Sequence, residues 1–374
     1  MEESMKGKIY VLHVVGRMDR GGTEALIMSL IRKMDRTKFQ LDIVEQTEDV
    51  CSHDQEVQAL GSVIYRCPAI SLLGLNKYRK WWRRFFAEHD EYRIVHGHSR
   101  GSAPIYLREA RRAGRTTIVH CHNNSFGKGI KGIIRKIWQL PLRNLADINL
   151  ACSHDSGIAQ YGRHNPFTVI NNGIESEKFA FNKYKRMEMR SELSLDGRFV
   201  VGNVARYVEQ KNHTFLLKIF RELLNMEHEA VLLLIGSGPL EEKIRSQAEE
   251  MHMADSIIFS GEHSNIADYY QAMDVFVLPS LFEGLGIVNI EAQCAGLPCI
   301  VSDTVAPEAK VTNLLRFLSL EEAPEKWAAE IIRGWKESGE RRTRVKEVQE
   351  KGFDINWTVG QLQKLYINAL EKTR

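Results

Sequence analysis

No apolar run in this sequence is long enough to cross a membrane as a helix. A bilayer span needs roughly 18 consecutive apolar residues, whereas the apolar runs here, such as Ile9–Val15 and Ala230–Ile235, have the length of strands. The N-terminal segment also lacks the basic start, the apolar stretch and the small-residue cleavage site of a signal peptide. We therefore expect a chain that works in the cytoplasm.

Cysteine pairs and two common nucleotide-binding motifs are also absent. The 374 residues include six scattered cysteines, and no two of them form a C-x-x-C pair. This pattern argues against a disulfide framework or a zinc site and favours reduced, buried thiols. No G-x-G-x-x-G sequence and no lysine-containing phosphate loop follow the first strand-like run. Their absence disfavours a nicotinamide-dependent dehydrogenase and a P-loop nucleotidase.

Positive charge is concentrated in the first half of the chain. The whole sequence carries a formal net charge of +3, but residues 1–175 carry +8 and the remainder carries −5. Within residues 76–143 the net charge reaches +12. A basic half of this kind suits an anionic partner, such as a phospholipid surface, a diphosphate or a nucleic acid.

Strand-like and helix-like segments alternate along nearly the whole chain. One series of apolar strands runs from residue 8 to 170, and a second runs from 199 to 301. Such alternation predicts parallel sheets, so we expect an α/β protein with two doubly wound, Rossmann-like domains facing across a cleft. We place the domains at 1–178 and 179–356, with the polar stretch 175–196 as their linker. Ligands of such sheets bind beyond the carboxyl ends of strands, so residues that follow strands are candidates for function.

The segment 279–291 (PSLFEGLGIVNIE) follows a strand-like run and leads into a helix. Its glycines allow a ligand to approach the backbone, and the free N–H groups at the helix start favour an anionic or hydroxyl-rich group. Glu283 stands at the mouth of this turn, and Glu291 follows within the helix. Two such carboxylates could hold a sugar at one end and a ribose at the other. The alternative is that Glu283 caps the helix and Glu291 is a solvated helix residue.

A pair of cations follows the first strand of the second series. Arg206 comes just after the strand-like run 199–204, and Lys211 stands five positions later in a loop. Two cations in such a loop can clamp a diphosphate and stabilise negative charge on a leaving group. The alternative is an ordinary pair of solvated surface charges.

Glycines and histidines mark strand ends in the first half. The loop 16–24 (GRMDRGGTE) precedes a helix, and its Gly22 suits close approach to a phosphate or an acceptor. Four histidines occupy alternate positions at the ends of two strand-like runs: His96, His98, His120 and His122. No carboxylate or cysteine completes a clear zinc site beside them, so we expect no metal. We favour a hydrogen-bonding role toward substrate for His122 and a structural role for His96.

Taken together, these segments resemble the retaining GT-B glycosyltransferases of family 4. That family is marked by E-x7-E after a P-S-x-x-E-G turn, by an arginine and a lysine five positions apart, by a Gly-Gly-x-E entry loop, and by an N-x-G-[IV]-[DE] turn. All four occur here within residues 9–308, the last as the run NNGIE at 171–175. Residues 303–308 depart from the glycine-rich loop that the family often shows there. The stretch 310–320 is similar to a subgroup found in bacterial capsular and exopolysaccharide synthesis.

The resemblance implies a role for each matching residue. The implied catalytic residues are Glu283, Arg206, Lys211 and His122. The implied donor-binding residues are Gly22, Arg206, Lys211, Glu262, His263, Glu283, Gly284, Leu285, Gly286 and Glu291. In this scheme Glu291 binds the ribose hydroxyls, Glu283 contacts the donor sugar, and the two cations hold the leaving diphosphate. Glu262 and His263 border the nucleotide base.

The resemblance also implies the reaction and its partners. The donor is expected to be a nucleotide-sugar, with UDP as the nucleotide, and the acceptor a lipid-linked glycan in the synthesis of bacterial capsule or exopolysaccharide. No metal or other cofactor is expected, because the chain lacks the D-x-D motif with which the other glycosyltransferase fold binds a metal and a diphosphate. The first domain is expected to bind the acceptor, and a C-terminal helix at about 357–374 to pack back on it.

Two basic stretches of the first domain also carry aromatic and aliphatic residues. They are 77–86 (KYRKWWRRFF) and 128–138 (KGIKGIIRKIW). Such a mixture suits the surface of an anionic membrane. A lipid-linked acceptor at the inner face of the membrane explains the basic region more simply than a nucleic acid does, so we expect peripheral membrane association and no nucleic-acid partner. The alternative is that both stretches are helices with a core face and a solvated face.

Other functions share the predicted architecture. A nucleotide-sugar epimerase or a glycosyl phosphorylase would use the same two domains, and the phosphorylase would need pyridoxal phosphate. A non-catalytic nucleotide-sugar-binding protein would keep the same site without turnover. Donor turnover, and its loss when Glu283 is changed, distinguishes an enzyme from a binding protein.

Overall fold

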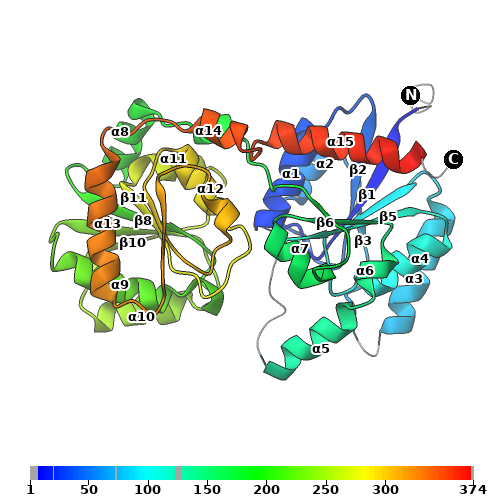
Figure 1. The fold of residues 1–374 in the computed structure, drawn as a ribbon, viewed down its shortest axis with the longest axis horizontal. Helices are drawn as coiled ribbons and strands as arrows, with labels where there is room; N and C mark the ends of the chain where they lie inside the picture. Colours follow the sequence, from blue (N-terminus) through cyan, green and yellow to red (C-terminus); the bar gives the residue numbers. More distant parts are fainter. Residues whose placement is uncertain (1–6, 20, 72–73, 123–128, 372–374) are drawn as a thin grey trace. The chain divides into compact units, whose positions relative to one another are not determined.

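The computed structural model describes residues 7–19, 21–71, 74–122 and 129–371 (Figure 1). The chain divides into two compact units. Unit 1 comprises residues 1–173 and 355–374, and unit 2 comprises residues 174–354. The sequence analysis places the corresponding boundaries at 178 and 356.

Unit 1 is built on a parallel sheet. Its described strands are β1 (Ile9–Val15), β2 (Phe39–Glu45), β3 (Ile64–Arg66), β4 (Ile94–Gly97), β5 (Thr116–Cys121), β6 (Ile148–Ala151) and β7 (Thr168–Val169). They lie in the order β3-β2-β1-β4-β5-β6-β7, and every neighbouring pair is parallel. Strands β4 and β5 are buried along their whole length, as expected for a sheet covered on both faces.

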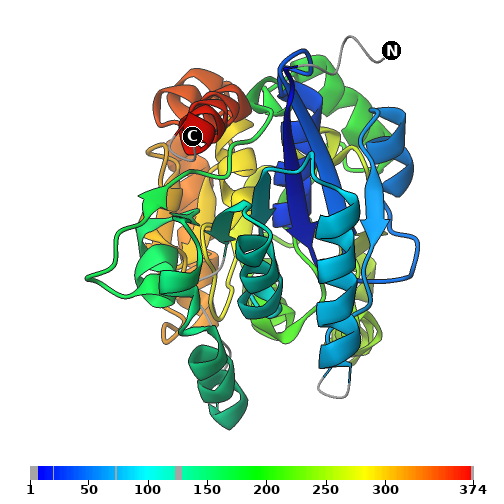
Figure 2. The ribbon, with the colours of Figure 1, turned by 90° about the vertical axis from the view of Figure 1, so that its right-hand side faces the viewer.

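Helices cover both faces of this sheet. One face packs against α1 (Gly22–Lys33), α2 (Asp54–Ala59) and α15 (Ile355–Glu371). The other face packs against α3 (Leu75–Glu88), α4 (Ala103–Arg112), α6 (Leu142–Leu145) and α7 (His154–Tyr161). Helix α5 (Gly129–Gln139) projects away from this body (Figure 1 and Figure 2), and none of its described residues belongs to either core.

Unit 2 is built on a second parallel sheet. Its strands are β8 (Phe199–Val204), β9 (Ala230–Ile235), β10 (Ile257–Gly261), β11 (Val275–Leu278), β12 (Cys299–Ser302) and β13 (Leu315–Leu318). They lie in the order β10-β9-β8-β11-β12-β13, again all parallel. Strand β13 is not predicted from the sequence, because this short strand lies at the sheet edge and only its first residue is buried.

Helices also cover both faces of the unit 2 sheet. One face packs against α9 (His213–Leu224), α10 (Glu241–Glu250) and α13 (Pro324–Ser338). The other face packs against α8 (Lys183–Glu192), α11 (Ile266–Ala272), α12 (Ile287–Cys294) and α14 (Val345–Glu350). Among the described helices of both units, none has the length and apolar content that crossing a membrane requires.

The polar stretch predicted as a linker is instead a folded part of unit 2. A 3-10 turn, η2 (Ser176–Phe179), and helix α8 occupy most of it. Met189 of α8 enters the hydrophobic core, and Arg190 forms an ion pair of 3.2 Å with Asp274. The prediction was wrong because polarity along a segment does not reveal an acidic partner 84 residues further along the chain.

The strand order reverses once in each sheet. The chain passes from β1 outward to β2 and β3 and then returns to β4 on the other side of β1, and β8 to β11 repeat this path. The predicted α/β class with two doubly wound domains is therefore confirmed. Ligands of such sheets bind beyond the carboxyl ends of the strands where the order reverses. The carboxyl ends of β1 and β4, and those of β8 and β11, are thus the places to examine.

Helix α15 brings the end of the chain back to unit 1. Its buried residues Val359 and Leu362 share a core with β1 and α1. Tyr366 is fully buried, and its hydroxyl lies 2.7 Å from Nδ1 of His96 on β4. This hydrogen bond fastens the helix to the centre of the sheet.

Replacing Tyr366 by phenylalanine should destabilise unit 1. The change leaves a nitrogen of the buried His96 without its partner, which costs about 1–3 kcal/mol. Urea unfolding followed by circular dichroism should show a loss of this size. Trp357 lies on the same helix and is 57% exposed, so Trp357→Phe should stay within about 0.5 kcal/mol of the wild type. Equal stability of Tyr366→Phe and the wild type would show that the hydroxyl does not fasten α15.

Candidate active site

Loops that follow four strands of unit 2 meet at one edge of its sheet. They are residues 205–212 after β8, 236–240 after β9, 262–265 after β10 and 279–286 after β11. They share this edge because all the strands are parallel. Apart from Gly22 in unit 1, every predicted donor-binding residue lies in one of these loops or in α12.

The loop after β8 is held against the loop after β9 by backbone contacts. Gly236 has a φ of 135°, and a Cβ atom there would lie 2.2 Å from the carbonyl oxygen of Ala205. Only glycine permits so close an approach of two backbones. The N–H of Tyr207 donates a 2.9 Å hydrogen bond to the carbonyl of Ser237. Arg206 therefore stands on a backbone that is fixed on both sides.

The loop after β8 is also joined to the loop after β11. The N–H of Leu281 donates to the carbonyl of Gln210 at 2.8 Å, and Nε2 of Gln210 donates to the carbonyl of Phe282 at 2.9 Å. Nδ2 of Asn212 donates to the carbonyl of Pro279 at 3.1 Å. The role of these two amides is not predicted from the sequence, because their partners lie about seventy residues away along the chain.

Lys211 and Glu283 form an ion pair between these two loops. Their side chains are only 17% and 13% exposed, so each charge relies on the other for neutralisation. Arg206 is exposed, and its guanidinium forms no ion pair with any residue that the structure describes. Beside this neutralised pair, the guanidinium of Arg206 is therefore a cation that a phosphate group could contact.

Helix α12 begins directly after the glycine turn. Gly286 has a φ of 62°, in the left-handed region, and a Cβ atom there would lie 2.6 Å from Nδ2 of Asn289. No side chain caps this helix start, so N–H groups of the first turn remain available to a ligand. Gly284 and Leu285 are buried, and Leu285 belongs to the core of unit 2. Leu285 can therefore contribute only its backbone to a ligand.

Glu291 lies further along α12 and is almost fully buried, with 6% of its surface exposed. The hydroxyl of Tyr270 donates a 2.8 Å hydrogen bond to its Oε2. Burial raises the pKa of Glu291 to about 7, because removal from water disfavours the charged form, and the bond from Tyr270 opposes the shift. The alternative of a solvated helix residue is thus excluded. Tyr270 was missed, since a tyrosine within a helix carries no sequence signal for such a contact.

Glu262 and His263 follow β10 at the same edge. Ser237 Oγ donates to Glu262, which connects the loops after β9 and β10. The His263 ring lies against the ring of Tyr269, with centroids 4.1 Å apart and planes inclined by 25°. Its Nδ1 lies 3.0 Å from the Tyr269 hydroxyl, and its Nε2 lies 2.8 Å from Ser260 Oγ. The two aromatic rings are thus locked together beside the exposed carboxyl group of Glu262.

The remaining predicted residues, Gly22 and His122, belong to unit 1. Gly22 is exposed and begins α1, after β1, although Arg20 of the same loop lies outside the described residues. His122 directly follows β5 and is partly buried. Its Nδ1 lies 3.1 Å from Oδ1 of Asn172, and its Nε2 lies 2.8 Å from Nδ1 of His98. Both residues therefore stand at the carboxyl edge of the unit 1 sheet.

Comparison with known families covers most of the chain. Residues 185–351 match the family "Glycosyl transferases group 1", and residues 20–178 match "Glycosyltransferase Family 4". The chain is a family 4 glycosyltransferase. The resemblance inferred from the ordered motifs is thereby confirmed.

Individual relatives of this glycosyltransferase align over between 60% and 97% of its length. EpsF of Bacillus subtilis (strain 168), which carries a provisional assignment as a glycosyltransferase, is 33% identical and aligns over 97% of both chains. An Escherichia coli UDP-Gal:alpha-D-GlcNAc-diphosphoundecaprenol alpha-1,3-galactosyltransferase is 30% identical over 60% of this chain and 61% of its own. Among solved structures, Anabaena HepE in complex with UDP and glucose has a TM-score of 0.78 and 15% identity, covering 95% of this chain and 98% of its own. This likeness shows the GT-B fold.

Glu291→Gln should stabilise this glycosyltransferase at pH 8 and have little effect at pH 5. A folded-state pKa of about 7, above the ordinary 4.5, means that the wild type loses stability as the pH rises from 4.5 to 7. Glutamine has no proton to lose, so the variant should gain up to about 3 kcal/mol at pH 8. Urea unfolding at both pH values measures the difference. Glu250 is exposed, so Glu250→Gln should show none. A gain of equal size at both pH values would contradict the raised pKa.

Proposed function

We propose that this glycosyltransferase moves a sugar from a UDP-sugar to a lipid-linked glycan, with retention of configuration at the anomeric carbon. The observation that supports this proposal best is the buried pair of Lys211 and Glu283, which joins the ends of β8 and β11 beside an uncapped helix start. A cation, a carboxylate and free N–H groups at one place match the three chemical parts of a nucleotide-sugar.

Each part of the donor has a matching group at this edge. Glu291 accepts hydrogen bonds from the ribose hydroxyls, and Glu262 and His263 border the base. Lys211 and Arg206 hold the diphosphate. When the diphosphate takes over the charge of Lys211, the carboxylate of Glu283 becomes free to accept hydrogen bonds from the sugar. The donor therefore replaces the ion pair by contacts of its own: its diphosphate pairs with Lys211, and its sugar hydroxyls hydrogen-bond to the carboxylate of Glu283.

The reaction breaks the bond between the anomeric carbon and the phosphate oxygen. An acceptor hydroxyl oxygen bonds to that carbon on the same face, and its proton passes to the leaving diphosphate. The transition state resembles an oxocarbenium ion, and catalysis comes from positioning and from stabilisation of the departing negative charge. Arg206 and Lys211 provide that stabilisation, so the proposed reaction needs no metal ion.

Two relatives support the choice of donor and acceptor. HepE from Anabaena has been solved with UDP-glucose, and its TM-score to this chain is 0.77 at 16% identity. The Escherichia coli relative uses UDP-Gal and a diphosphoundecaprenol acceptor by name. A lipid-linked acceptor of this kind requires the enzyme to reach a membrane surface. We propose peripheral association with the inner face of the cell membrane, in the synthesis of a cell-surface polysaccharide such as capsule or exopolysaccharide.

Of the two predicted membrane-binding stretches, the structure favours the second. In 77–86, which lies in α3, the aromatic residues Tyr78, Trp82, Phe85 and Phe86 are buried in the core of unit 1. The apolar side of α3 is thus a core face, as the alternative for this stretch supposes, and only its basic side faces solvent. Its three arginines are also paired. Arg83 and Arg84 contact Glu109 and Glu88 at 2.9 and 2.8 Å, and Arg79 lies 3.7 Å from Glu109.

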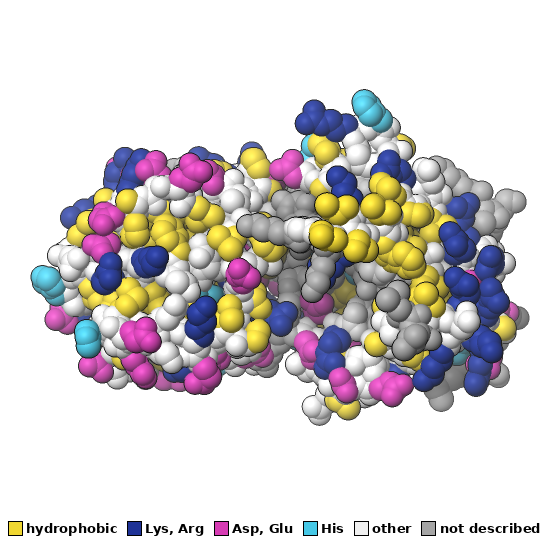
Figure 3. Space-filling view, turned by 90° about the horizontal axis from the view of Figure 1, so that it is seen from below, with side chains coloured by type: hydrophobic (Ala, Val, Ile, Leu, Met, Phe, Trp, Pro, Cys, Tyr) yellow, Lys and Arg dark blue, Asp and Glu magenta, His cyan; other side chains and the backbone are white. Residues whose placement is uncertain are grey.

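Helix α5, in the second stretch, has the opposite character, although Lys128 of that stretch lies outside the described residues. Its four isoleucines form one stripe with helical spacing and are each about 60% exposed or more: Ile130, Ile133, Ile134 and Ile137. Arg135 and Lys136 are exposed on the same helix. Trp138 fastens the end of α5 through a 2.8 Å hydrogen bond to the carbonyl of Gly101. Figure 3 shows hydrophobic side chains bordered by Lys and Arg on this side of unit 1. An apolar stripe flanked by cations suits insertion into an anionic bilayer surface.

Lys211→Ala should abolish most turnover and also weaken UDP binding, because Lys211 helps to hold the diphosphate. Removal of one charge that stabilises a leaving group costs about 100- to 1,000-fold in kcat. UDP release from UDP-glucose and UDP-galactose, with a bacterial lipid extract as acceptor, measures the rate, and calorimetry measures UDP binding. Lys218 is exposed on α9, so Lys218→Ala is the matched control and should retain wild-type activity.

Glu283→Gln separates an enzyme from a binding protein. The change keeps the size of the side chain and should eliminate turnover without weakening UDP binding, because Glu291 and Arg206 are untouched. Thermal unfolding with a panel of nucleotide-sugars identifies the donor, since a ligand of the folded state raises its stability. A wild type that binds a nucleotide-sugar but never releases the nucleotide would contradict the proposed enzyme.

Ile133→Ser combined with Ile137→Ser should weaken membrane binding. Loss of two isoleucines that insert into lipid should reduce affinity about 30-fold or more. Flotation with vesicles of phosphatidylglycerol and phosphatidylcholine in a 1:3 ratio measures binding, and vesicles of phosphatidylcholine alone test the charge dependence. Val50 is an exposed apolar residue elsewhere in unit 1, so Val50→Ser is the matched control. Equal binding of the wild type and the double variant would exclude α5 as the contact.

A further inference from the structure

Histidines gather on one side of the unit 1 sheet, on β1, β4 and β5 and directly after β4 and β5. They are His13, His96, His98, His120 and His122. Four of the five are buried, and only His122 is partly exposed. They lie toward the face that α1 and α15 cover, where Tyr366 of α15 contacts His96. A layer of imidazoles in a core is costly unless their nitrogens are paired, because each ring carries two polar nitrogens.

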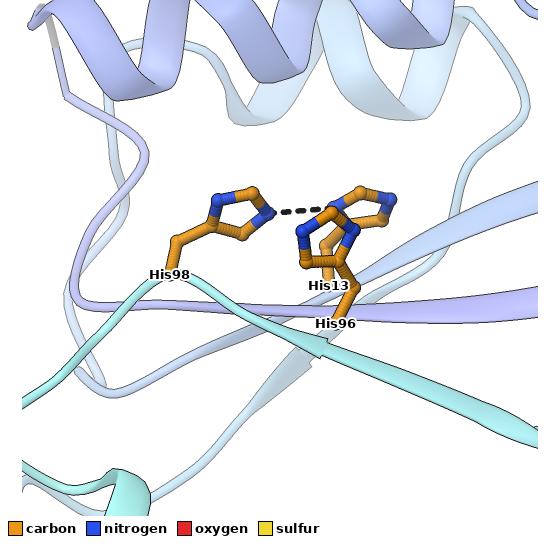
Figure 4. Close-up of side chains that lie close together, drawn as sticks. All are labelled: His13, His96 and His98. Carbon is orange, nitrogen blue, oxygen red and sulfur yellow. Dashed lines mark hydrogen bonds between the residues drawn. The ribbon is translucent and has the colours of Figure 1, made fainter. Parts of the chain in front are cut away.

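Three of these rings form a chain of hydrogen bonds that ends at an amide. Nδ1 of His13 lies 2.9 Å from Nε2 of His98, and the planes of these two rings differ by 11° (Figure 4). Nδ1 of His98 lies 2.8 Å from Nε2 of His122, with planes that differ by 19°. Nδ1 of His122 lies 3.1 Å from Oδ1 of Asn172. The rings are thus joined edge to edge and nearly coplanar, as linear N–H···N bonds require.

Asn172 determines which nitrogen of each ring in this hydrogen-bond chain carries the proton. Burial keeps the rings neutral, since it lowers the pKa of His13 to about 3 and that of His122 to about 4. A neutral imidazole has one N–H donor and one acceptor nitrogen. The oxygen of Asn172 accepts only, so Nδ1 of His122 carries the proton and its Nε2 accepts from His98. By the same rule, His98 and His13 also carry their protons on Nδ1.

A metal ion is the other ligand that such a cluster suits. Two sets of three histidines among the described residues, which share His98, place one nitrogen of each within 4.8 Å of the others. A metal needs a lone pair directed at it from every ligand. Both nitrogens of His98 instead face neighbouring rings almost in plane. The arrangement therefore favours protons between the rings, and metal binding is an outcome that the experiment must detect.

We propose that His13, His98 and Asn172 are positioning residues that hold His122 in the neutral form protonated on Nδ1, so that His122 serves glycosyl transfer only as a hydrogen-bond donor. This inference rests on the proposed function. The lone pair on Nε2 of His122 is occupied by the proton of His98, so His122 cannot accept a proton from the acceptor hydroxyl. Its Nδ1–H can change partner from Asn172 to an oxygen of the substrate. The chain of hydrogen bonds thus determines both the orientation of the His122 ring and that His122 donates a hydrogen bond to the substrate and does not accept one.

The tautomer can be read directly by NMR of the full-length protein labelled with 15N-histidine. We expect both His98 and His122 to be neutral and protonated on Nδ1 at pH 7, whereas free neutral histidine prefers the proton on Nε2. Protonation of His122 on Nε2 would overturn the proposal. Stoichiometric binding of Zn²⁺ that shifts the His13 and His98 resonances would also overturn it, because the nitrogens would then be metal ligands.

Two variants at His98 separate positioning from packing. Asparagine offers an amide N–H near the place of Nδ1 and can still donate to His122, whereas leucine fills the space without a donor. His98→Leu should lower kcat about 100-fold, as expected when a reacting group is misplaced, with little change in the KM for the donor. His98→Asn should restore most of this loss, together with the Nδ1-protonated signal of His122.

The control is His96→Leu, which removes a neighbouring buried imidazole that is not part of the chain. It should lower thermal stability while leaving the His122 tautomer and kcat unchanged. Equal kcat values and equal His122 spectra for His98→Leu and His98→Asn would refute the positioning role. If neither the wild type nor any variant turns over a donor, the proposed function fails. The NMR result still decides whether the hydrogen bonds that join His13, His98 and His122 exist.

Discussion

Parallel strands bring their carboxyl ends to one edge of a sheet, and this constraint places every candidate functional residue of the protein. In unit 2 it gathers the loops after β8, β9, β10 and β11, although 80 positions separate the first predicted residue, Arg206, from the last turn residue, Gly286. The reversal of strand order between β8 and β11 opens room there for a ligand. Close backbone contacts at Gly236 and the amide bonds of Gln210 then make the edge rigid.

Charged groups at this edge are buried further than stability alone would favour. Glu291 loses most of its hydration and keeps one hydrogen bond from Tyr270, which is why its pKa rises. The pairing of Lys211 with Glu283 reduces the same penalty for both charges. Such unfavourable burial of charged groups is common at binding sites, where a bound ligand supplies the missing partner. A nucleotide-sugar would supply hydroxyls to the carboxylates and a diphosphate to the cation.

The same parallel arrangement gives unit 1 a different chemistry. Its central strands carry histidines within them or directly after them, and burial keeps these rings neutral. The polar groups here are therefore linked by hydrogen bonds between neutral rings and not by ion pairs. Its positive charge lies instead on outer helices. Of these, α3 turns its aromatic residues inward, whereas α5 leaves its isoleucines in solvent. Of these two helices, as far as the structure describes them, α5 is the one that combines exposed apolar surface with cations, a combination that suits a lipid surface.

The sequence alone determined the α/β class, the two doubly wound domains and the family, because strand and helix periodicity and short ordered motifs are local patterns. It also predicted Arg206, Lys211, Glu283 and Glu291 as residues of the donor site. Only the tertiary structure decided which of these meet: Lys211 pairs with a carboxylate 72 residues away, and Glu291 is buried against Tyr270. Tertiary contacts likewise made the polar stretch 175–196 part of a folded unit. They also bury the aromatic residues of α3, whereas the isoleucines of α5 stay exposed. The partner and the burial of a side chain depend on segments distant in sequence, which no local pattern specifies.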